Sequence, residues 1–391
     1  MPNLPEIENQ LPTLTAWRQD LHQHPELLFD THRTSDLVAQ RLRDFGCDEV
    51  VTGIGRTGVV GVIKGKTQAS GKVIGLRADM DALPIHEATG LPYASETEGK
   101  MHACGHDGHT TMLLGGAQYL AATRNFDGTA VIIFQPAEEG GGGGKVMCDD
   151  GLMERFGIQE VYGMHNMPGM PLGDFAIKPG AFFASTDEFD ITIHGRGGHA
   201  AKPDTTIDPT TTAAQLILAL QTIASRNADP MKPIVVSATS FETASTAFNV
   251  IPPSVMIKGT VRTMDKDTRE PAEQRIREIT KHIPAAAGAT AEIHYHHGYP
   301  VMANSPAETE FAAEVARDIA GPARVSTDAA ALMGGEDFAY MLEERPGAYI
   351  LVGNGDTAMV HHPEYDFDDN ALPVGASYWA RLIEKRMPAS A

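Results

Sequence analysis

The chain has little cysteine, little positive charge and no long apolar run, and each shortage excludes a class of protein. Three cysteines in 391 residues are too few for a disulfide-stapled secreted domain. Lys and Arg total 31 against 51 Asp and Glu, a net charge of −20, so nucleic acid and anionic membranes would repel it. Apolar runs such as AAQLILAL are too short to span a bilayer, and the N-terminal segment lacks the basic and apolar regions of a signal peptide. We therefore expect a cytoplasmic protein without nucleic-acid or membrane partners.

The apolar residues that are present predict an α/β domain. A length of 391 residues with 42% apolar content favours two domains. Two helices are predicted over 14–29 and 33–46, and buried strands over 59–65, 72–81, 129–140 and 158–168, with a helix over 109–124 between two of them. The order strand, helix, strand favours parallel pairing, and open sheets of this kind bind ligands beyond the carboxyl ends of their strands.

The pattern changes after about residue 185. Strands over 187–195, 233–244, 254–263 and 290–299 and helices over 208–225 and 268–288 follow in the order β-α-β-β-α-β. That order is typical of a small split-βαβ sandwich. Helix-then-strand patterning returns at 308–321 and 347–355, so we expect a domain of residues 186–297 inserted into a domain of residues 1–185 and 298–391. The glycine run at 140–144 is predicted to be a flexible or close-packed loop.

The stretch MHACGHDGH places thiolate and imidazole donors within one loop. Cys104 and His106 are ligand types that zinc and similar ions prefer, although the spacing alone is weak. Other donors stand at predicted strand ends: Asp79, Asp81, Glu138, Glu139 and His165, with His361 and His362 near the C-terminus. Two adjacent carboxylates beside a metal allow one to ligate while the other moves protons.

Each of these residues also has a simpler interpretation. Cys104 can be a buried thiol, and the Glu138–Glu139 pair a solvated turn. Asp107 can cap the following helix, and His102 and His109 can be supporting groups rather than ligands. His22, His24 and the cluster His294, His296 and His297 are interpreted as ordinary surface or strand residues.

A second group of polar residues lies in the inserted segment. His199 stands in GRGGHAAKP, Asn249 in AFNVIPP and Arg262 in GTVR. An imidazole on a glycine-rich loop could donate to a developing oxyanion, and a turn histidine without function is the alternative.

Eight motifs, in order along nearly the whole chain, resemble the metal-dependent aminoacylase and carboxypeptidase superfamily. Within it they are similar to hippurate hydrolases, N-acyl-amino-acid amidohydrolases and plant auxin-conjugate hydrolases. The motifs are LRADMDALP, MHACGHDGH, FQPAEEGG, YGMHN, GRGGHAAKP, FNVIP, GGEDFAYM and HHPEYDF. The resemblance implies an aminopeptidase-like catalytic domain with a mixed, mostly parallel sheet. It also implies an α+β ferredoxin-like satellite domain that makes a homodimer or higher homo-oligomer.

The resemblance also implies the roles of the site residues. Two divalent ions (zinc, manganese, nickel or cobalt) would be held by Cys104, His106, Glu139, His165 and His361, with the thiolate of Cys104 between them and His362 as the alternative to His361. Glu138 would be the general base and acid, and Asp81 would orient a ligand histidine. His199 would stabilise the oxyanion, and the substrate carboxylate would be bound by Asn249, Arg262, Gly334 and Gly335.

The implied reaction is hydrolysis of an N-acyl-amino acid to a carboxylic acid and a free amino acid. The alternatives are a metallo-dipeptidase or carboxypeptidase of the same superfamily, and a metal-binding relative without catalysis. A peptidase of the first kind would need a polar group for the substrate ammonium, and none can be located in the sequence.

Overall fold

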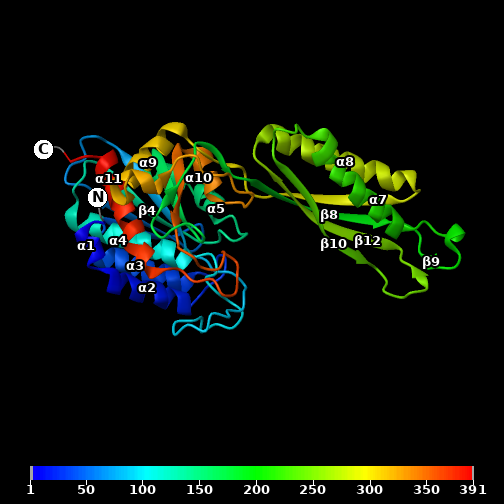
Figure 1. Cartoon of the computed structure of the whole chain (residues 1–391), viewed down its shortest axis with the longest axis horizontal. Coiled ribbons are helices and arrows are strands. Elements are labelled where there is room, and N and C mark those ends of the chain that lie inside the picture. The colour runs from blue at the N-terminus through cyan, green and yellow to red at the C-terminus, as the bar shows by residue number, and fades with distance from the viewer. Residues whose placement is uncertain (1–2, 390–391) are drawn as a thin grey trace. The chain divides into compact units, whose positions relative to one another are not determined.

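The computed structural model describes residues 3–389 and divides the chain into two units (Figure 1). Unit 1 contains the residues up to Gly180, Ala303–Ala330 and the residues from Asp337 onward. Unit 2 contains Ala181–Met302 and Ala331–Glu336. The chain changes unit near β7 (Gly180–Phe183) and β14 (Met302–Asn304), and again before and after Ala331–Glu336.

Unit 1 is built on an eight-stranded mixed sheet with strand order β1-β2-β4-β3-β5-β16-β6-β15. The four central strands, β4, β3, β5 and β16, are mutually parallel, whereas β1, β2 and β6 pair antiparallel with their inner neighbours. The strand bounds are β1 Glu49–Ile54, β2 Gly58–Lys64, β3 Val73–Asp79, β4 Thr129–Gln135, β5 Glu160–Met167, β6 Phe175–Ala176, β15 Val325–Ser326 and β16 Gly347–Gly353. The predicted α/β class with a mixed, mostly parallel sheet is confirmed.

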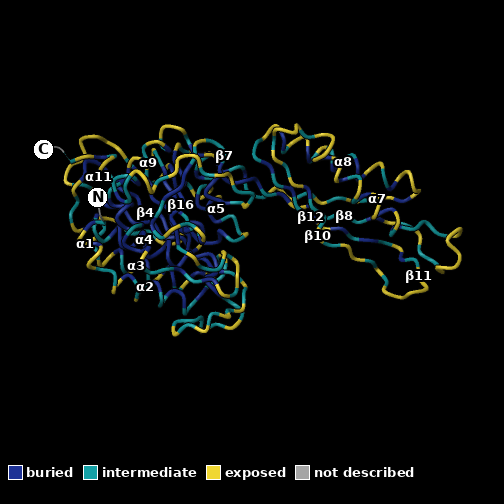
Figure 2. The backbone as a smooth tube through the Cα atoms, viewed as in Figure 1, coloured by how far each residue is buried: buried dark blue, intermediate teal, exposed yellow. Residues whose placement is uncertain are grey.

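Helices cover both faces of this sheet. The larger layer is centred on α4 and α11, which pack against each other and join the strands in one apolar core. It comprises α1 Pro5–Glu8, α2 Leu11–Gln23, α3 His32–Asp44, α4 His106–Thr123, α9 Pro306–Ala320 and α11 Leu372–Arg386. On the other face α5 (Gly143–Asp149) packs against α10 (Phe338–Glu344) and the short α6 (Leu152–Phe156). Both strands are buried almost throughout (Figure 2), which explains why β16 and the interior of β4, between Thr129 and Gln135, are apolar.

Unit 2 is a four-stranded antiparallel sheet, in the order β10-β12-β8-β13, with two helices on one face. Its elements in chain order are β8 Ser185–His194, α7 Pro209–Thr222, β10 Ile234–Thr243, β12 Ser254–Thr263, α8 Lys266–Ala286 and β13 Thr290–His297. Chain order and strand order together are those of a ferredoxin-like sandwich. Inward residues such as Phe189, Ile191 and Ile257 alternate with less buried ones, as expected of a sheet covered on one side.

The glycine run after β4 is close-packed where α5 begins. A Cβ on Gly143 would lie 1.6 Å from the carbonyl oxygen of Pro136, and Gly142 has a φ of +63°. The loop after β4 can therefore fold back tightly only with glycine at these positions. Among the helices of residues 3–389, none is both long and apolar enough to cross a membrane.

Candidate metal centre

Three parallel neighbouring strands and the loop before α4 bring most of the predicted site residues to one edge of the sheet in unit 1. Asp79 is the last residue of β3, Glu138 and Glu139 follow β4, and His165 lies near the end of β5. Cys104 precedes α4, whose first residue is His106. Because the carboxyl ends of parallel strands meet at one edge, residues far apart in sequence converge there.

The five predicted ligands form two overlapping groups. Cys104 stands with His106 and His165 in one group and with Glu139 and His361 in the other, and within each group the donor atoms lie within 4.8 Å of one another. Cys104 Sγ is 3.4 Å from His165 Nε2, and Glu139 Oε1 is 3.5 Å from His361 Nε2. Cys104 is therefore the shared member, which is the arrangement that a bridging thiolate requires.

Several donor atoms of this site are buried and have no hydrogen-bond partner, as expected of atoms that bind metal ions. Both ring nitrogens of His106 and Glu139 Oε1 are buried and have no hydrogen-bond partner within the described chain. Such orphaned atoms are costly unless they have another partner. Thiolate, imidazole and carboxylate donors converging in this way suit divalent transition metals.

The charge balance of the site also favours cations. Burial, reinforced by Glu139 and Glu138, raises the pKa of the Cys104 thiol well above its ordinary value. Burial disfavours a charged His106, but Asp79 and the other carboxylates around it outweigh burial and raise its pKa to about 10. The carboxylates of Asp79, Asp81 and Glu139 all face His106, and a bound cation would offset the negative charge that they bring together.

Asp81 holds the segment that carries both glutamates. Its Oδ1 accepts the backbone N–H of Glu138 at 2.9 Å, and its Oδ2 accepts that of Glu139 at 3.1 Å. Asp81 Oδ1 also lies 3.5 Å from His106 Nδ1. The carboxylate therefore contacts both the histidine predicted to be a ligand and the loop of the predicted general base.

Two of the simpler interpretations of residues near this loop are wrong. Asp107 does not cap α4: the N-cap is Gly105, and the Asp107 carboxylate instead accepts from His22 Nδ1 at 2.8 Å and lies 3.6 Å from Arg18. His22 is a fully buried residue and not a surface one. The missed signal is its position in α2, four residues after Arg18 and eight after Leu14, on the inward side of the helix.

The structure does not bring the predicted substrate-binding residues of unit 2 together. His199 lies in β9 (Gly198–His199), which pairs with β11 (Val250–Ile251) just after Asn249, near the start of β12. Arg262 is near the other end of β12, eight residues beyond Ser254, which is roughly 27 Å of strand.

At the Arg262 end, Arg262 pairs with Thr186, and a Cβ on Gly335 would lie 2.3 Å from Thr186 Cγ2. The backbone carbonyl of the neighbouring Gly334 accepts from the N–H of Ala184 at 3.0 Å. Arg262 and the two glycines thus lie at one end of unit 2, and His199 and Asn249 lie at the other.

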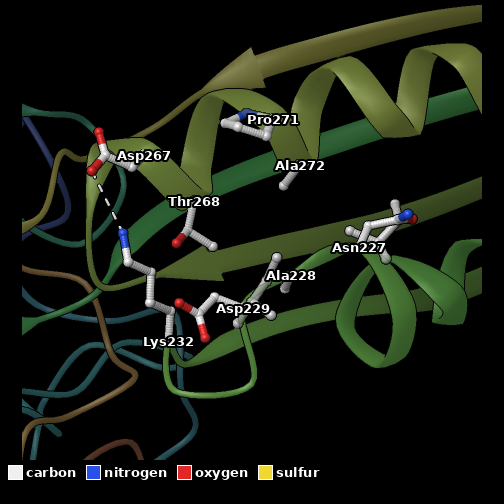
Figure 3. A pocket seen from close by; sticks show the side chains of 10 residues that line it. Asn227, Ala228, Asp229, Lys232, Asp267, Thr268, Pro271 and Ala272 are labelled. Atoms are coloured by element: carbon white, nitrogen blue, oxygen red, sulfur yellow. Dashed lines mark ion pairs between the residues drawn. The ribbon is translucent and has the colours of Figure 1, made fainter.

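Unit 2 also has a cavity of about 220 Å³ beside the start of α8 (Figure 3). Its lining includes Asn227, Asp229, Lys232, Asp267 and Thr268. Lys232 is already paired with Asp265 at 2.9 Å and with Asp267 at 3.5 Å. The lining contains none of the motif residues, so the cavity adds nothing to the candidate site.

Comparison with known proteins identifies the family. Residues 75–385 match peptidase family M20/M25/M40. The chain is 45% identical to the hippurate hydrolase of Campylobacter jejuni over 382 residues, 98% of each protein, and 40% identical to an N-acetyl-L-cysteine deacetylase of Bacillus subtilis, covering 98% of this chain and 90% of that protein. The chain belongs to peptidase family M20/M25/M40, which confirms the superfamily resemblance.

A solved relative supports the same assignment. The crystal structure of the Bacillus subtilis YXEP protein, a dinuclear metal binding peptidase from the M20 family, superposes with a TM-score of 0.83 at 35% identity. The match covers 98% of this chain and all of that one. The likeness therefore extends over both units and not only over the metal-site motifs.

Proposed function

We propose that this chain is a metal-dependent amidohydrolase that cleaves the amide bond of N-acyl-L-amino acids such as hippurate. The observation that carries the proposal is a donor set, from buried Cys104 and His106 to exposed His361, in which Cys104 is common to two groups of ligands, with Glu138 beside it. The 45% identity to a hippurate hydrolase and the 40% identity to an N-acetyl-L-cysteine deacetylase support the substrate class.

Two divalent ions would be held by the five converging residues, Cys104, His106, Glu139, His165 and His361. When bound, such ions polarise the amide carbonyl and lower the pKa of the attacking water. A site with thiolate and imidazole ligands favours zinc or nickel, while manganese and cobalt remain compatible with it. The dinuclear metal binding of the similar Bacillus subtilis protein supports the number of ions.

Glu138 would move the proton that the reaction requires. It is buried, with 8% of its surface exposed, and Asp81 fixes its backbone. Its carboxylate takes a proton from water as the water oxygen bonds to the amide carbon. It then gives that proton to the leaving nitrogen as the carbon–nitrogen bond breaks.

Binding of the substrate carboxylate and of the oxyanion is assigned to residues of unit 2. Arg262, with Asn249, Gly334 and Gly335, would hold the carboxylate, and a guanidinium can do so through two parallel hydrogen bonds. His199 would donate to the oxyanion. Since His199 and Asn249 lie at the opposite end of β12 from Arg262, we propose that both reach the site of a second subunit.

A homodimer through unit 2 fits its exposed surface. Strand β10 is at the edge of the sheet, where its backbone can pair with a second copy. Large apolar side chains are exposed on this unit: Leu218, Met231, Val235, Phe241, Phe248 and Val250. Sedimentation velocity should give a dimer for the wild type and a monomer for Phe241→Lys with Val235→Lys; a monomeric wild type would contradict the assignment.

We also propose a cytoplasmic location, supported by the free thiols of Cys47 and Cys148. Fractionation of the source cells should recover the protein with cytoplasmic markers. Recovery with secreted or periplasmic proteins would refute this location.

The function is tested by benzoate release from hippurate. Metal-free protein is loaded with zinc, manganese, nickel or cobalt in turn and assayed with hippurate, other N-acyl-amino acids and dipeptides with a free N-terminus. We expect turnover of the acylated substrates with at least one metal. Cleavage of the dipeptides alone would assign a peptidase, and no turnover on any substrate with any metal would refute the enzyme.

A further inference from the structure

A chain of buried polar contacts runs beneath the candidate ligands and begins at Arg77 in β3. Its three guanidinium nitrogens have three different partners: Nε donates to Gln135 at 2.9 Å, one terminal nitrogen to Asp79 Oδ2 at 2.6 Å and the other to Asp337 at 3.0 Å. Arg77 is fully buried, as are both aspartates. Asp337 also accepts the backbone N–H of Gly144 at 2.8 Å, which holds the far end of the loop that carries Glu138 and Glu139.

Asp79 also contacts two residues of α4. Its Oδ1 is 2.7 Å from His109 Nδ1, and its backbone carbonyl accepts from the hydroxyl of Thr110 at 2.7 Å. The backbone N–H of Asn166 donates to His109 Nε2 at 2.9 Å, so the ring proton is on Nδ1 and is donated to Asp79. Both carboxylate oxygens of Asp79 are thus engaged, one by a guanidinium and one by an imidazole.

Asn166 connects His109 to the loop that contains Cys104. Its side-chain amide donates to the carbonyl oxygen of Cys104 at 2.7 Å, and its Oδ1 accepts from the hydroxyl of Tyr365 at 2.9 Å. Gly105 has a φ of +86°, and a Cβ there would lie 2.4 Å from both Asn166 Nδ2 and the Tyr365 hydroxyl. Glycine at this position lets the loop approach the amide closely enough for the hydrogen bond.

We infer that Asp79 is a positioning residue: through His109 and Asn166, it fixes the backbone of Cys104 so that the thiol faces both groups of ligands. This inference rests on the proposed metal centre. It distinguishes Asp79 from the five ligands, although Asp79 lies at the same edge and its Oδ2 is 3.8 Å from His106 Nε2. An asparagine at 79 would leave the Arg77 guanidinium with less compensating charge and would loosen the hold on His109.

The test compares Asp79→Asn with a matched variant, Asp127→Asn. Asp127 is also a buried carboxylate of unit 1, but it precedes β4 and accepts from Thr67, Ala69 and Ser70 at the other end of that strand. Cobalt binding is measured by competition with a chelator, the thiolate-to-cobalt charge-transfer absorption reports Cys104, and kcat and KM are measured for hippurate.

The positioning role predicts that Asp79→Asn binds cobalt about 10- to 100-fold more weakly. At saturation it should still hold the wild-type number of ions with the thiolate absorption present, and kcat should fall more than KM rises. Asp127→Asn should match the wild type in all of these measurements. Wild-type affinity in Asp79→Asn would overturn the inference, and so would the loss of one ion at saturation, because Asp79 would then be a ligand.

Tyr365→Phe provides a second variant in case Asp79→Asn does not fold. It removes one hydroxyl from the far end of the chain of contacts and should weaken cobalt binding in the same direction, by a smaller factor; wild-type affinity would count against the inference. If the wild type binds cobalt but hydrolyses nothing, the proposed function fails while these affinities still test Asp79. If it hydrolyses hippurate and the affinities are equal, only the positioning role fails.

Discussion

The buried ion pair of His22 gives the chain a pH-dependent stability whose size can be worked out. His22 Nδ1 is 2.8 Å from Asp107 Oδ2, and Nε2 is 3.4 Å from Glu87 Oε1. Burial alone would lower the pKa of this histidine, but the bond to Asp107 and the contact with Glu87 outweigh burial and raise the pKa from 6.5 to about 9. The charged form therefore stabilises the fold.

The sign of the pH dependence follows from the direction in which the pKa of His22 is shifted. Since the pKa is higher in the folded state, the stabilisation is fully present below about pH 6.5 and is lost as the pH rises through 9. At about 1.4 kcal/mol for each pH unit, the shift corresponds to about 3 kcal/mol of unfolding free energy. The same ion pair also lowers the pKa of Asp107, against the effect of burial, so the pair is counted once.

The assay is urea unfolding of His22→Gln and wild type at pH 6 and pH 10, with a chelator present. Trp17 in α2 and Trp379 in α11 both belong to unit 1, and the chain has two tryptophans, so their fluorescence follows this unit alone. The free-energy difference between variant and wild type should be about 3 kcal/mol larger at pH 6 than at pH 10.

The matched control is His24→Gln, the same substitution two residues later at a side chain that is 36% exposed. We expect a small effect that is similar at both pH values. Equal destabilisation by His22→Gln at pH 6 and pH 10 would refute the reasoning.

Three further predictions concern the proposed reaction. Glu138→Gln should lower kcat for hippurate about 10²- to 10⁴-fold while elemental analysis finds wild-type metal content; loss of metal would mean that the roles of Glu138 and Glu139 are exchanged. Cys104→Ser should lose metal by the same analysis, since Cys104 belongs to both ligand groups, and full occupancy with full activity would reassign the bridge. Arg262→Lys should raise the KM for hippurate about tenfold with kcat little changed, and an unchanged KM would remove Arg262 as the carboxylate clamp.

The fold could be predicted where burial and chain order act together. The interiors of β4 and β16 are apolar because helices cover both of their faces, and β3, α4 and β4 follow in the order that makes β3 and β4 parallel. The first helix was predicted to continue to Phe29 but ends at Gln23, because Pro25 disfavours helical geometry at the residue before it. The two-residue strands β6 and β15 have too little sequence to carry a pattern.

The candidate site could be predicted in part for the same reason. Residues after parallel strands converge, so Glu139 and His165 could be placed beside the Cys104 loop. The buried polar contacts could not, because Arg18 and His22 lie on the inward side of α2, where periodicity leads one to expect apolar residues. Their partner Asp107 is 85 residues from His22 in the chain, and the sequence contains no local sign of that pairing.

Strand β3 shows how one short motif organises the site without supplying any of the five proposed ligands. In LRADMD alternate residues point to opposite sides: Leu76, Ala78 and Met80 join the apolar core, and Arg77, Asp79 and Asp81 form the polar side. Each polar residue reaches a different segment, since Arg77 binds Asp337, Asp79 binds α4 and Asp81 binds the loop after β4. A substitution on this polar side should therefore displace ligands that come from other segments. For that reason, substitutions of Asp79 and of Asp81 should have different structural effects, although the two residues are close in sequence. Loss of the Asp79 carboxylate should loosen the Cys104 loop, and loss of the Asp81 carboxylate should free the two glutamates.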